Sequence, residues 1–323
     1  MRTLLTLAGL ILISFFSSAQ TDTNAYIMVL GVAQDGGYPH VGCAKQCCQT
    51  AWSNPAMQRY VTSLALVDPV AGKWWLIEAT PDITRQLHYF QEQTGGRFSY
   101  LPWGIFVTHA HIGHYTGLMQ LGKEAMNTSR MPVYVLPEMK KYLQSNGPWS
   151  QLVKIQNITL VDQLQIHPDS NFHLQDTVVY NISDRFSVAA FTVPHRDEFS
   201  ETAGFLITTR TKKYMFIPDI DKWQKWSVDI RKLVGSVDIA LLDGTFFANG
   251  ELPGRNMAVV PHPFVSETMH LFTDLPSTPV PPSLRARIHF IHFNHTNPLL
   301  WDDEARDQVR QKNFNIAQQG QKL

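Results

Sequence analysis

The feature that most constrains this chain is a group of three histidines within six positions. His109, His111 and His114 follow a short apolar run, Ile105–Thr108, that predicts a buried strand, and they precede a helical pattern that starts at Thr116. A turn between a strand and a helix can bring such closely spaced imidazoles onto one site, and neutral imidazole binds Zn, Fe, Mn or Ni. A single histidine is usually an ordinary core or surface residue, whereas three at one turn indicate a metal centre.

The size and charge of the chain narrow the class of partner. Its 323 residues are 44% hydrophobic and include eight tryptophans, which is enough for a substantial core. Lys plus Arg and Asp plus Glu both number 27, so no field of one sign would attract the chain to nucleic acid or to an anionic membrane. We therefore expect a small-molecule substrate and no nucleic-acid partner.

The first residues have the pattern of a secretory signal peptide. Arg2 precedes an apolar run, Leu4–Phe16, which is followed by small residues up to Ala19. The run is shorter than the roughly 20 residues that a membrane-spanning helix needs. We predict that residues 1–19 are removed, which gives a periplasmic or secreted protein without a membrane span. An uncleaved N-terminal anchor is the alternative.

Strand and helix patterns alternate along the rest of the chain. Strands are expected at Tyr26–Val32, Ser63–Asp68, Lys73–Glu78, Ile105–Thr108, Met131–Leu136, Phe186–Val193, Gly204–Thr209, Lys213–Ile217, Val237–Asp243 and Arg287–Phe293. Helices are expected at Pro81–Gln93, Thr116–Met126, Pro137–Asn146, Val228–Val234 and Pro298–Lys312, the last with Asn297 as its N-cap. Because no Gly-rich phosphate loop, repeat or linker interrupts this alternation, it predicts a layered α/β sandwich that forms one domain over residues 20–323.

Three further polar residues, His195, Asp219 and His292, each stand at the end of an apolar strand. Together with the histidine cluster, their order resembles the motifs of the metallo-β-lactamase superfamily. The resemblance implies an αββα sandwich with two neighbouring metal sites, whose ligands would be His109, His111 and His195 at the first, His114 and His292 at the second, and Asp219 between them. The superfamily motif reads His-x-His-x-Asp-His, but Gly113 stands at the aspartate position, so the second site and the usual general base lack that carboxylate.

Longer stretches are similar to one branch of the superfamily, the pyrroloquinoline quinone biosynthesis protein B (PqqB) group and its phosphodiesterase relatives. These stretches are Val29–Gly31, Asp35–Pro39, Glu78–Ile83, Asp243–Phe247 and Asn294–Pro298. Proteins of that group lack a complete His-x-His pair and work in the cytoplasm, whereas this chain keeps both histidines and begins with an export pattern. The resemblance therefore implies a PqqB-like paralogue rather than the cofactor-biosynthesis enzyme.

The three cysteines, Cys43, Cys47 and Cys48, lie within six positions. An exported protein usually pairs its cysteines, but three cannot all pair. The PqqB resemblance implies a structural zinc held by the three cysteines and His295 in a closed Cys3His shell. The spacing here, Cys-x-x-x-Cys-Cys, differs from the Cys-x-Cys-x-x-Cys of that branch. A disulfide with one free thiol is the alternative.

The expected activity is hydrolysis of an ester, lactone or phosphodiester bond. A metal held at the first site, zinc or else iron or manganese, would lower the pKa of a bound water toward 7. The general base would be hydroxide on that metal or a strand-end carboxylate such as Asp243. His262 would donate a proton or contact the substrate, unless it is a loop histidine without a role. Oxygen activation at an iron site, and binding of a metal or ligand without catalysis, are the two other functions considered.

Overall fold

The computed structural model describes residues 24–161, 174, 177–273 and 280–323. The predicted signal peptide, residues 1–19, lies outside this part of the chain. Within the part described, no helix is both long enough and apolar enough to cross a membrane.

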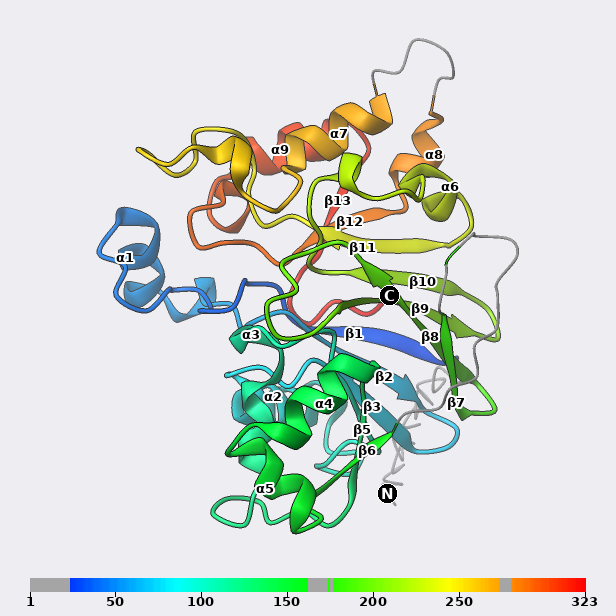
Figure 1. Cartoon of the computed structure of the whole chain (residues 1–323). Coiled ribbons are helices and arrows are strands. Elements are labelled where there is room, and N and C mark those ends of the chain that lie inside the picture. The colour runs from blue at the N-terminus through cyan, green and yellow to red at the C-terminus, as the bar shows by residue number, and fades with distance from the viewer. Residues whose placement is uncertain (1–23, 162–173, 175–176, 274–279) are drawn as a thin grey trace, which may run out of the picture.

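Two β-sheets lie face to face at the centre of the molecule, and helices cover both outer faces (Figure 1). The first sheet contains, in chain order, β1 (Tyr26–Gly31), β2 (Ser63–Asp68), β3 (Lys73–Ile77), β4 (Ile105–Phe106), β5 (Met131–Tyr134) and β6 (Ile158–Val161). The second contains β7 (Val178–Ser183), β8 (Phe186–Val193), β9 (Thr202–Thr209), β10 (Lys213–Ile217), β11 (Ile239–Asp243), β12 (Ile288–Ile291) and β13 (Asn315–Ile316). The predicted αββα sandwich is confirmed.

Both sheets change from antiparallel to parallel pairing along their width. β1 to β3 pair antiparallel and β3 to β6 pair parallel. In the second sheet, β7 to β10 pair antiparallel and β10 to β13 pair parallel. The parallel strands of each sheet therefore end at a common edge, where the loops that follow them can share one site.

The strands bury both faces because each sheet is covered twice. In β1, Ile27 and Val29 belong to the core between the two sheets, whereas Met28 and Leu30 belong to the core between the first sheet and its helices. Side chains alternate between the faces of a strand, so a strand covered on both sides must be apolar throughout. This explains the continuous apolar run that predicted β1.

The helices form the two outer layers (Figure 1). The first sheet is covered by α2 (Ile83–Thr94), α4 (Pro137–Ser145) and α5 (Trp149–Lys154), and the second by α6 (Ile230–Gly235), α7 (Val265–Thr273), α8 (Pro282–Arg285) and α9 (Asp303–Gln311). The short α1 (Gln46–Ser53), which carries two of the cysteines, lies at the left of Figure 1.

Two of the predicted helices differ from the structure. The range Thr116–Met126 holds a 3₁₀ segment, Thr116–Leu121, in place of an α-helix, and a four-residue helix, α3 (Ile112–Tyr115), precedes it. The helix expected from Pro298 is a 3₁₀ turn capped by Asn297, and α9 starts separately because the Asp302 carboxylate accepts hydrogen bonds from two later backbone N–H groups.

Candidate metal centre

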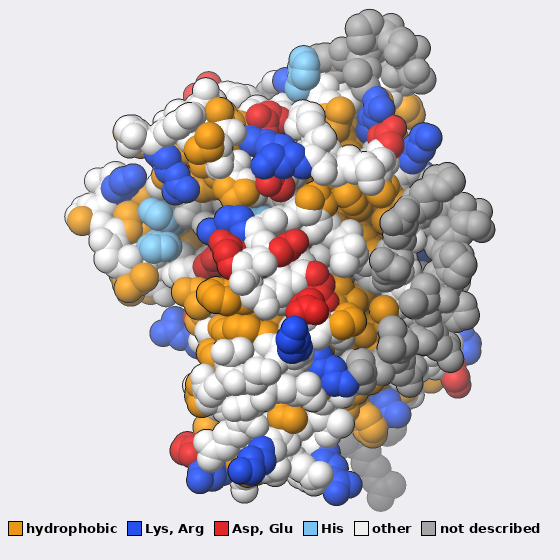
Figure 2. Space-filling model, in the orientation of Figure 1, with side chains coloured by type: hydrophobic (Ala, Val, Ile, Leu, Met, Phe, Trp, Pro, Cys, Tyr) orange, Lys and Arg blue, Asp and Glu red, His pale blue; other side chains and the backbone are white. Residues whose placement is uncertain are grey.

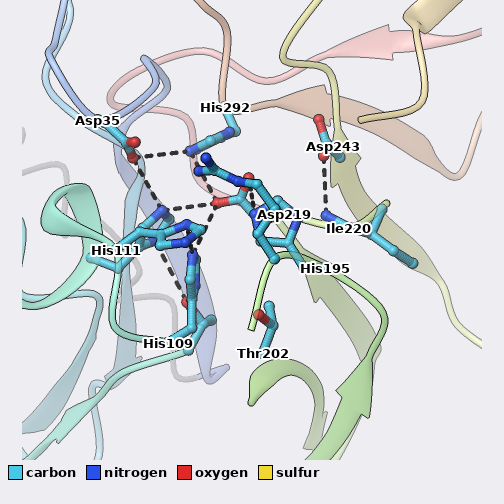
Figure 3. Close-up of polar contacts among 12 residues, drawn as sticks. Asp35, His109, His111, His195, Thr202, Asp219, Ile220, Asp243 and His292 are labelled. Atoms are coloured by element: carbon cyan, nitrogen blue, oxygen red, sulfur yellow. Dashed lines mark hydrogen bonds and ion pairs between the residues drawn. The ribbon is translucent and has the colours of Figure 1, made fainter. Parts of the chain in front are cut away.

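The residues predicted as metal ligands meet where strands of both sheets end. Figure 3 shows their side chains converging on one space from several loops. His109 and His111 lie between β4 and α3, and His114 lies within α3. The other predicted ligands follow β8, β10 and β12 of the second sheet: His195, Asp219 and His292. Each sheet therefore contributes part of the centre.

A first group of nitrogens comes from His109, His111 and His195. Their candidate ligand atoms all lie within 4.8 Å of one another, and His109 Nε2 is 2.8 Å from His111 Nδ1. Burial lowers the pKa of His109 well below its ordinary value, and burial lowers the pKa of His195 to about 4. Both imidazoles are therefore neutral at pH 7, as coordination of a metal requires.

A second group contains His114, His292 and an acid that was not predicted as a ligand, Asp35. Their candidate ligand atoms also lie within 4.8 Å of one another. Asp35 Oδ1 is 3.3 Å from His114 Nε2 and 3.8 Å from His292 Nε2. Both histidines are fully buried. This group brings together two predicted ligands of the second site with a carboxylate from the loop after β1.

Asp219 lies between the two groups. Its Oδ2 is 2.9 Å from His114 Nε2 and 3.3 Å from His292 Nε2 on one side, and 3.8 Å from His109 Nε2 on the other. Its Oδ1 is 3.9 Å from His195 Nε2. This position matches the bridging role that the sequence predicted for Asp219.

Unpartnered buried atoms test whether these residues fit a metal. His114 Nε2, His292 Nε2, both ring nitrogens of His195 and Asp35 Oδ1 are buried without a hydrogen bond of acceptable geometry. Buried polar atoms nearly always have a partner, so a group of them that faces one space needs an explanation. Imidazole nitrogens and carboxylate oxygens in this number are a donor set suited to Zn, Fe or Mn. The residues therefore fit two neighbouring divalent ions.

Hydrogen bonds behind the ligands fix their orientation. His114 Nδ1 is 3.1 Å from the buried Glu78 carboxylate, and His111 Nε2 is 3.0 Å from the half-exposed Glu198 carboxylate. Contacts of this kind set which imidazole nitrogen is free to bind a metal. Two residues of the centre, Glu78 and His292, also have positive φ angles of 72° and 67°, a backbone conformation that is strained in non-glycine residues and is often found at functional sites.

The Asp243 carboxylate is fully engaged in hydrogen bonds. Its Oδ1 accepts from the backbone N–H and the hydroxyl of Thr245, and its Oδ2 accepts from the Ile220 N–H at 3.1 Å and lies 2.8 Å from His262 Nδ1. It belongs to none of the candidate metal groups found among the described residues. This geometry favours a positioning role for Asp243 over the predicted role of general base.

His262 faces the centre from the second sheet. Its Nδ1 lies 3.5 Å from Asp219 Oδ1, and its ring centroid is 5.2 Å from that of His195. Burial lowers the pKa of His262, but the adjacent Asp243 carboxylate outweighs burial and raises it above the ordinary value. The predicted site residue is thus placed beside the ligands and not on a remote loop.

The cysteines form a separate group at α1. The sulfur atoms of Cys43, Cys47 and Cys48 lie within 4.8 Å of one another as free thiols. The expected fourth ligand, His295, lies outside this group of three at that distance. The His295 Nδ1 contacts the Asn294 side chain at 3.0 Å, and its ring packs against His40 at a centroid distance of 4.4 Å.

The sequence reasoning missed three acids of the centre, Asp35, Glu78 and Glu198. Asp35 and Glu78 follow apolar strands closely, and that position was the available signal. Glu198 lies three residues after His195 in a loop, and no sequence pattern distinguishes it from a surface acid.

Comparisons with known proteins agree with this architecture. Residues 73–293 match the family model described as a β-lactamase superfamily domain. Coenzyme PQQ synthesis protein B from Methylorubrum populi is 24% identical over 91% of this chain and 98% of the relative. The crystal structure of zinc-bound PqqB from Methylobacterium extorquens superposes with a TM-score of 0.69 at 21% identity, over 92% of this chain and 99% of that one. A diphosphatase from the PhnP family superposes with a TM-score of 0.61 at 19% identity, over 93% and 96%.

Proposed function

The chain belongs to the β-lactamase superfamily, and on that premise we propose that it is a metal-dependent hydrolase that cleaves an ester, lactone or phosphodiester bond. The observation that carries the proposal is the pair of three-ligand groups joined by Asp219. Two adjacent ions with a shared carboxylate are typical of hydrolytic two-metal sites. An iron oxygenase would use one ion on two histidines and a carboxylate, a donor set that the second group also offers. The adjacent three-histidine group, joined to it through Asp219, is what favours hydrolysis.

Different side chains around the centre would have different roles in the reaction. When bound, the metal ions supply Lewis-acid polarisation of the scissile group and lower the pKa of a coordinated water. His262 is placed to donate a proton to the leaving group, because its ring faces His195 and its Nδ1 is fixed by Asp243. Asp219 stays ionised, since the His292 and His114 imidazoles lower its pKa far more than burial raises it.

A groove of about 410 Å³ borders the segment that leads to His195. It is lined by Val193 and Pro194, which directly precede His195, and by Trp226, but by none of the candidate metal ligands. The surface in Figure 2 shows basic and acidic side chains interspersed, and neither sign forms a continuous patch on that face. Among the structural neighbours, the diphosphatase of the PhnP family acts on a phosphate compound, which supports including phosphodiesters among the substrates to be tested.

Metal analysis combined with substrate screens tests this proposal. The purified protein is assayed on aryl ester, lactone and phosphodiester probes, with and without oxygen, and its metal content is measured. We expect oxygen-independent hydrolysis that His111→Ala abolishes together with metal at the first site. His88→Ala, which changes an exposed histidine on α2, is the control. Iron content with oxygen consumption, or full metal and rate in His111→Ala, would overturn the hydrolase proposal.

Export is a further part of the proposal. Its support is the run Leu4–Phe16 with the small residues up to Ala19. N-terminal sequencing of protein recovered from the host periplasm should find a start close to residue 20. Recovery of mature protein that still begins with Met1 would contradict cleavage.

The proposal also includes a structural zinc ion bound by the three cysteines. The gathering of three free thiols supports it. Among the described residues, His40 and His295 are the candidates for a fourth ligand that we propose, because the His40 backbone N–H donates to Cys48 Sγ at 3.3 Å and the His295 ring packs on that of His40.

A further inference from the structure

Gly113 occupies the position at which the histidine motif of the superfamily has an aspartate, and in this chain no side chain fits there. A Cβ atom built on Gly113 would lie 2.1 Å from Asp35 Oδ1 and 2.6 Å from Asp35 Cα. Non-bonded contacts this short do not occur in proteins. The contact with the Asp35 Cα could be relieved only by a shift of the backbone. Asp35 therefore fills the space that a residue-113 side chain would take.

The carboxylate of Asp35 is also directed at the second group of ligands. Its Oδ1 approaches the Nε2 atoms of His114 and His292, and these three buried atoms have no hydrogen-bond partner of acceptable geometry. Figure 3 shows Asp35 beside His292 on the side of the centre away from His195. A carboxylate oxygen that faces two unpartnered imidazole nitrogens is arranged as a metal ligand.

The backbone holds Asp35 in this place through the strand end that carries His292. The Phe293 N–H donates to Val32 O at 2.8 Å, and the Gln34 N–H donates to Phe293 O at 2.8 Å. A tight turn follows, in which the Gly37 N–H donates to Gln34 O at 2.7 Å. The segments before Asp35 and after His292 are thus paired directly, so the two side chains are fixed relative to each other.

We propose that Asp35 supplies the second metal site with the carboxylate that the superfamily motif takes from the position of Gly113. The carboxylate then comes from the loop after β1 instead of from α3, and the two positions exclude each other because a side chain at residue 113 would overlap the carboxylate and the Cα of Asp35. The second site is then complete, with His114, His292, Asp35 and the bridging Asp219. This inference rests on the proposed metal-dependent function.

Metal stoichiometry tests the inference independently of activity. Zinc per chain is measured after equilibration with zinc and removal of the excess, and folding is followed by circular dichroism. Asp35→Ala should lose one ion relative to the unmodified protein, as His292→Ala does, while the first site keeps its ion. Gly113→Asp alone should lower the melting temperature, because its side chain would overlap both the carboxylate and the Cα of Asp35.

The outcomes separate this inference from the proposed function. If the unmodified protein and His111→Ala bind the same amount of zinc, the proposed metal-dependent function fails. If the unmodified protein and Asp35→Ala bind equal zinc while His292→Ala loses an ion, Asp35 is not a ligand and the inference is overturned. An unchanged melting temperature in Gly113→Asp would contradict the mutual exclusion of the two positions.

Discussion

Glu78 accepts a hydrogen bond from the Thr108 hydroxyl at 2.6 Å, in the fully buried interior behind the metal centre. The same hydroxyl lies 2.8 Å from His109 Nδ1. Because Glu78 also contacts His114 Nδ1, one buried acid orients a histidine of each metal group. Its position links the two sites more tightly than the ligand residues alone would.

Glu78→Gln should therefore weaken metal binding at both sites while leaving the fold intact. The amide keeps the shape of the side chain but removes the charge that strengthens its hydrogen bonds, and loss of such a partner behind a ligand typically lowers metal affinity about 10- to 100-fold. Titration against a chromophoric chelator measures the affinity. Glu124→Gln, at an exposed acid, is the control. An unchanged affinity in Glu78→Gln would show that the carboxylate does not orient the ligands.

His262→Asn should lower turnover without releasing metal. A positioned general acid typically contributes about 10²- to 10⁴-fold in rate, so we expect kcat to fall within that range. Metal content should equal that of the unmodified protein, because neither of the two proposed ligand groups includes His262, although its ring nitrogen also lies within 4.8 Å of ligand atoms of His195 and Asp219. Parallel measurement of kcat and bound metal checks this, with His88→Asn as the control. Loss of metal in proportion to activity would make His262 a ligand instead.

Cys43→Ser should release one zinc ion and leave the metal of the active centre in place. A closed structural site loses its ion when one of its thiolates is removed. Zinc per chain and hydrolytic rate are measured together, and His40→Ala and His295→Ala are compared to identify the fourth ligand. Unchanged zinc content together with a disulfide seen by mass spectrometry would favour the alternative interpretation of the cysteines.

Glu251→Gln should change how stability depends on pH. Burial raises the pKa of Glu251 to about 7, although the Thr296 hydroxyl and the Phe247 N–H donate hydrogen bonds to it. Between pH 4.5 and 7 the folded protein then keeps a proton that the unfolded chain has released, so the free energy of unfolding falls as pH rises.

Removal of this carboxyl should abolish about 3 kcal/mol of that fall. Denaturation of the unmodified protein, Glu251→Gln and the exposed-site control Glu124→Gln at pH 4.5 and pH 8 gives the difference. A Glu251→Gln variant that loses as much stability as the control between these two pH values would show that Glu251 ionises normally.

Sequence patterns predicted the buried strands well and the short elements poorly. Ser63–Asp68, Phe186–Val193 and Lys213–Ile217 were predicted with the bounds that the structure has. They are largely apolar runs inside sheets that are covered on both faces, where burial selects apolar residues. The edge strands β6, β7 and β13 were missed, since they are only partly buried and their apolar pattern is weaker, whereas the edge strand β1 is buried throughout and was predicted.

The metal centre could be predicted only as far as its residues lie in recognisable motifs. His109, His111 and His114 can be recognised by their close spacing in the sequence. The later ligands can be recognised by their place at the ends of predicted strands. Asp35 could not be assigned, because its approach to His114 depends on pairing between Val32 and Phe293, residues far apart in the chain. No local sequence pattern encodes such a contact. The sequence shows that the motif carboxylate is absent at Gly113, but it does not show which residue could supply a carboxylate instead.

The candidate ligands are divided between the two sheets, so neither half of the sandwich carries a complete ion site by itself. A complete set of ligands therefore forms only after the two sheets have packed together, so metal binding is expected at the final stage of folding. For a chain exported unfolded through the proposed signal peptide, that stage takes place outside the cytoplasm. The ions available in the outer compartment, rather than cytoplasmic metal supply, would then decide which metal this protein carries.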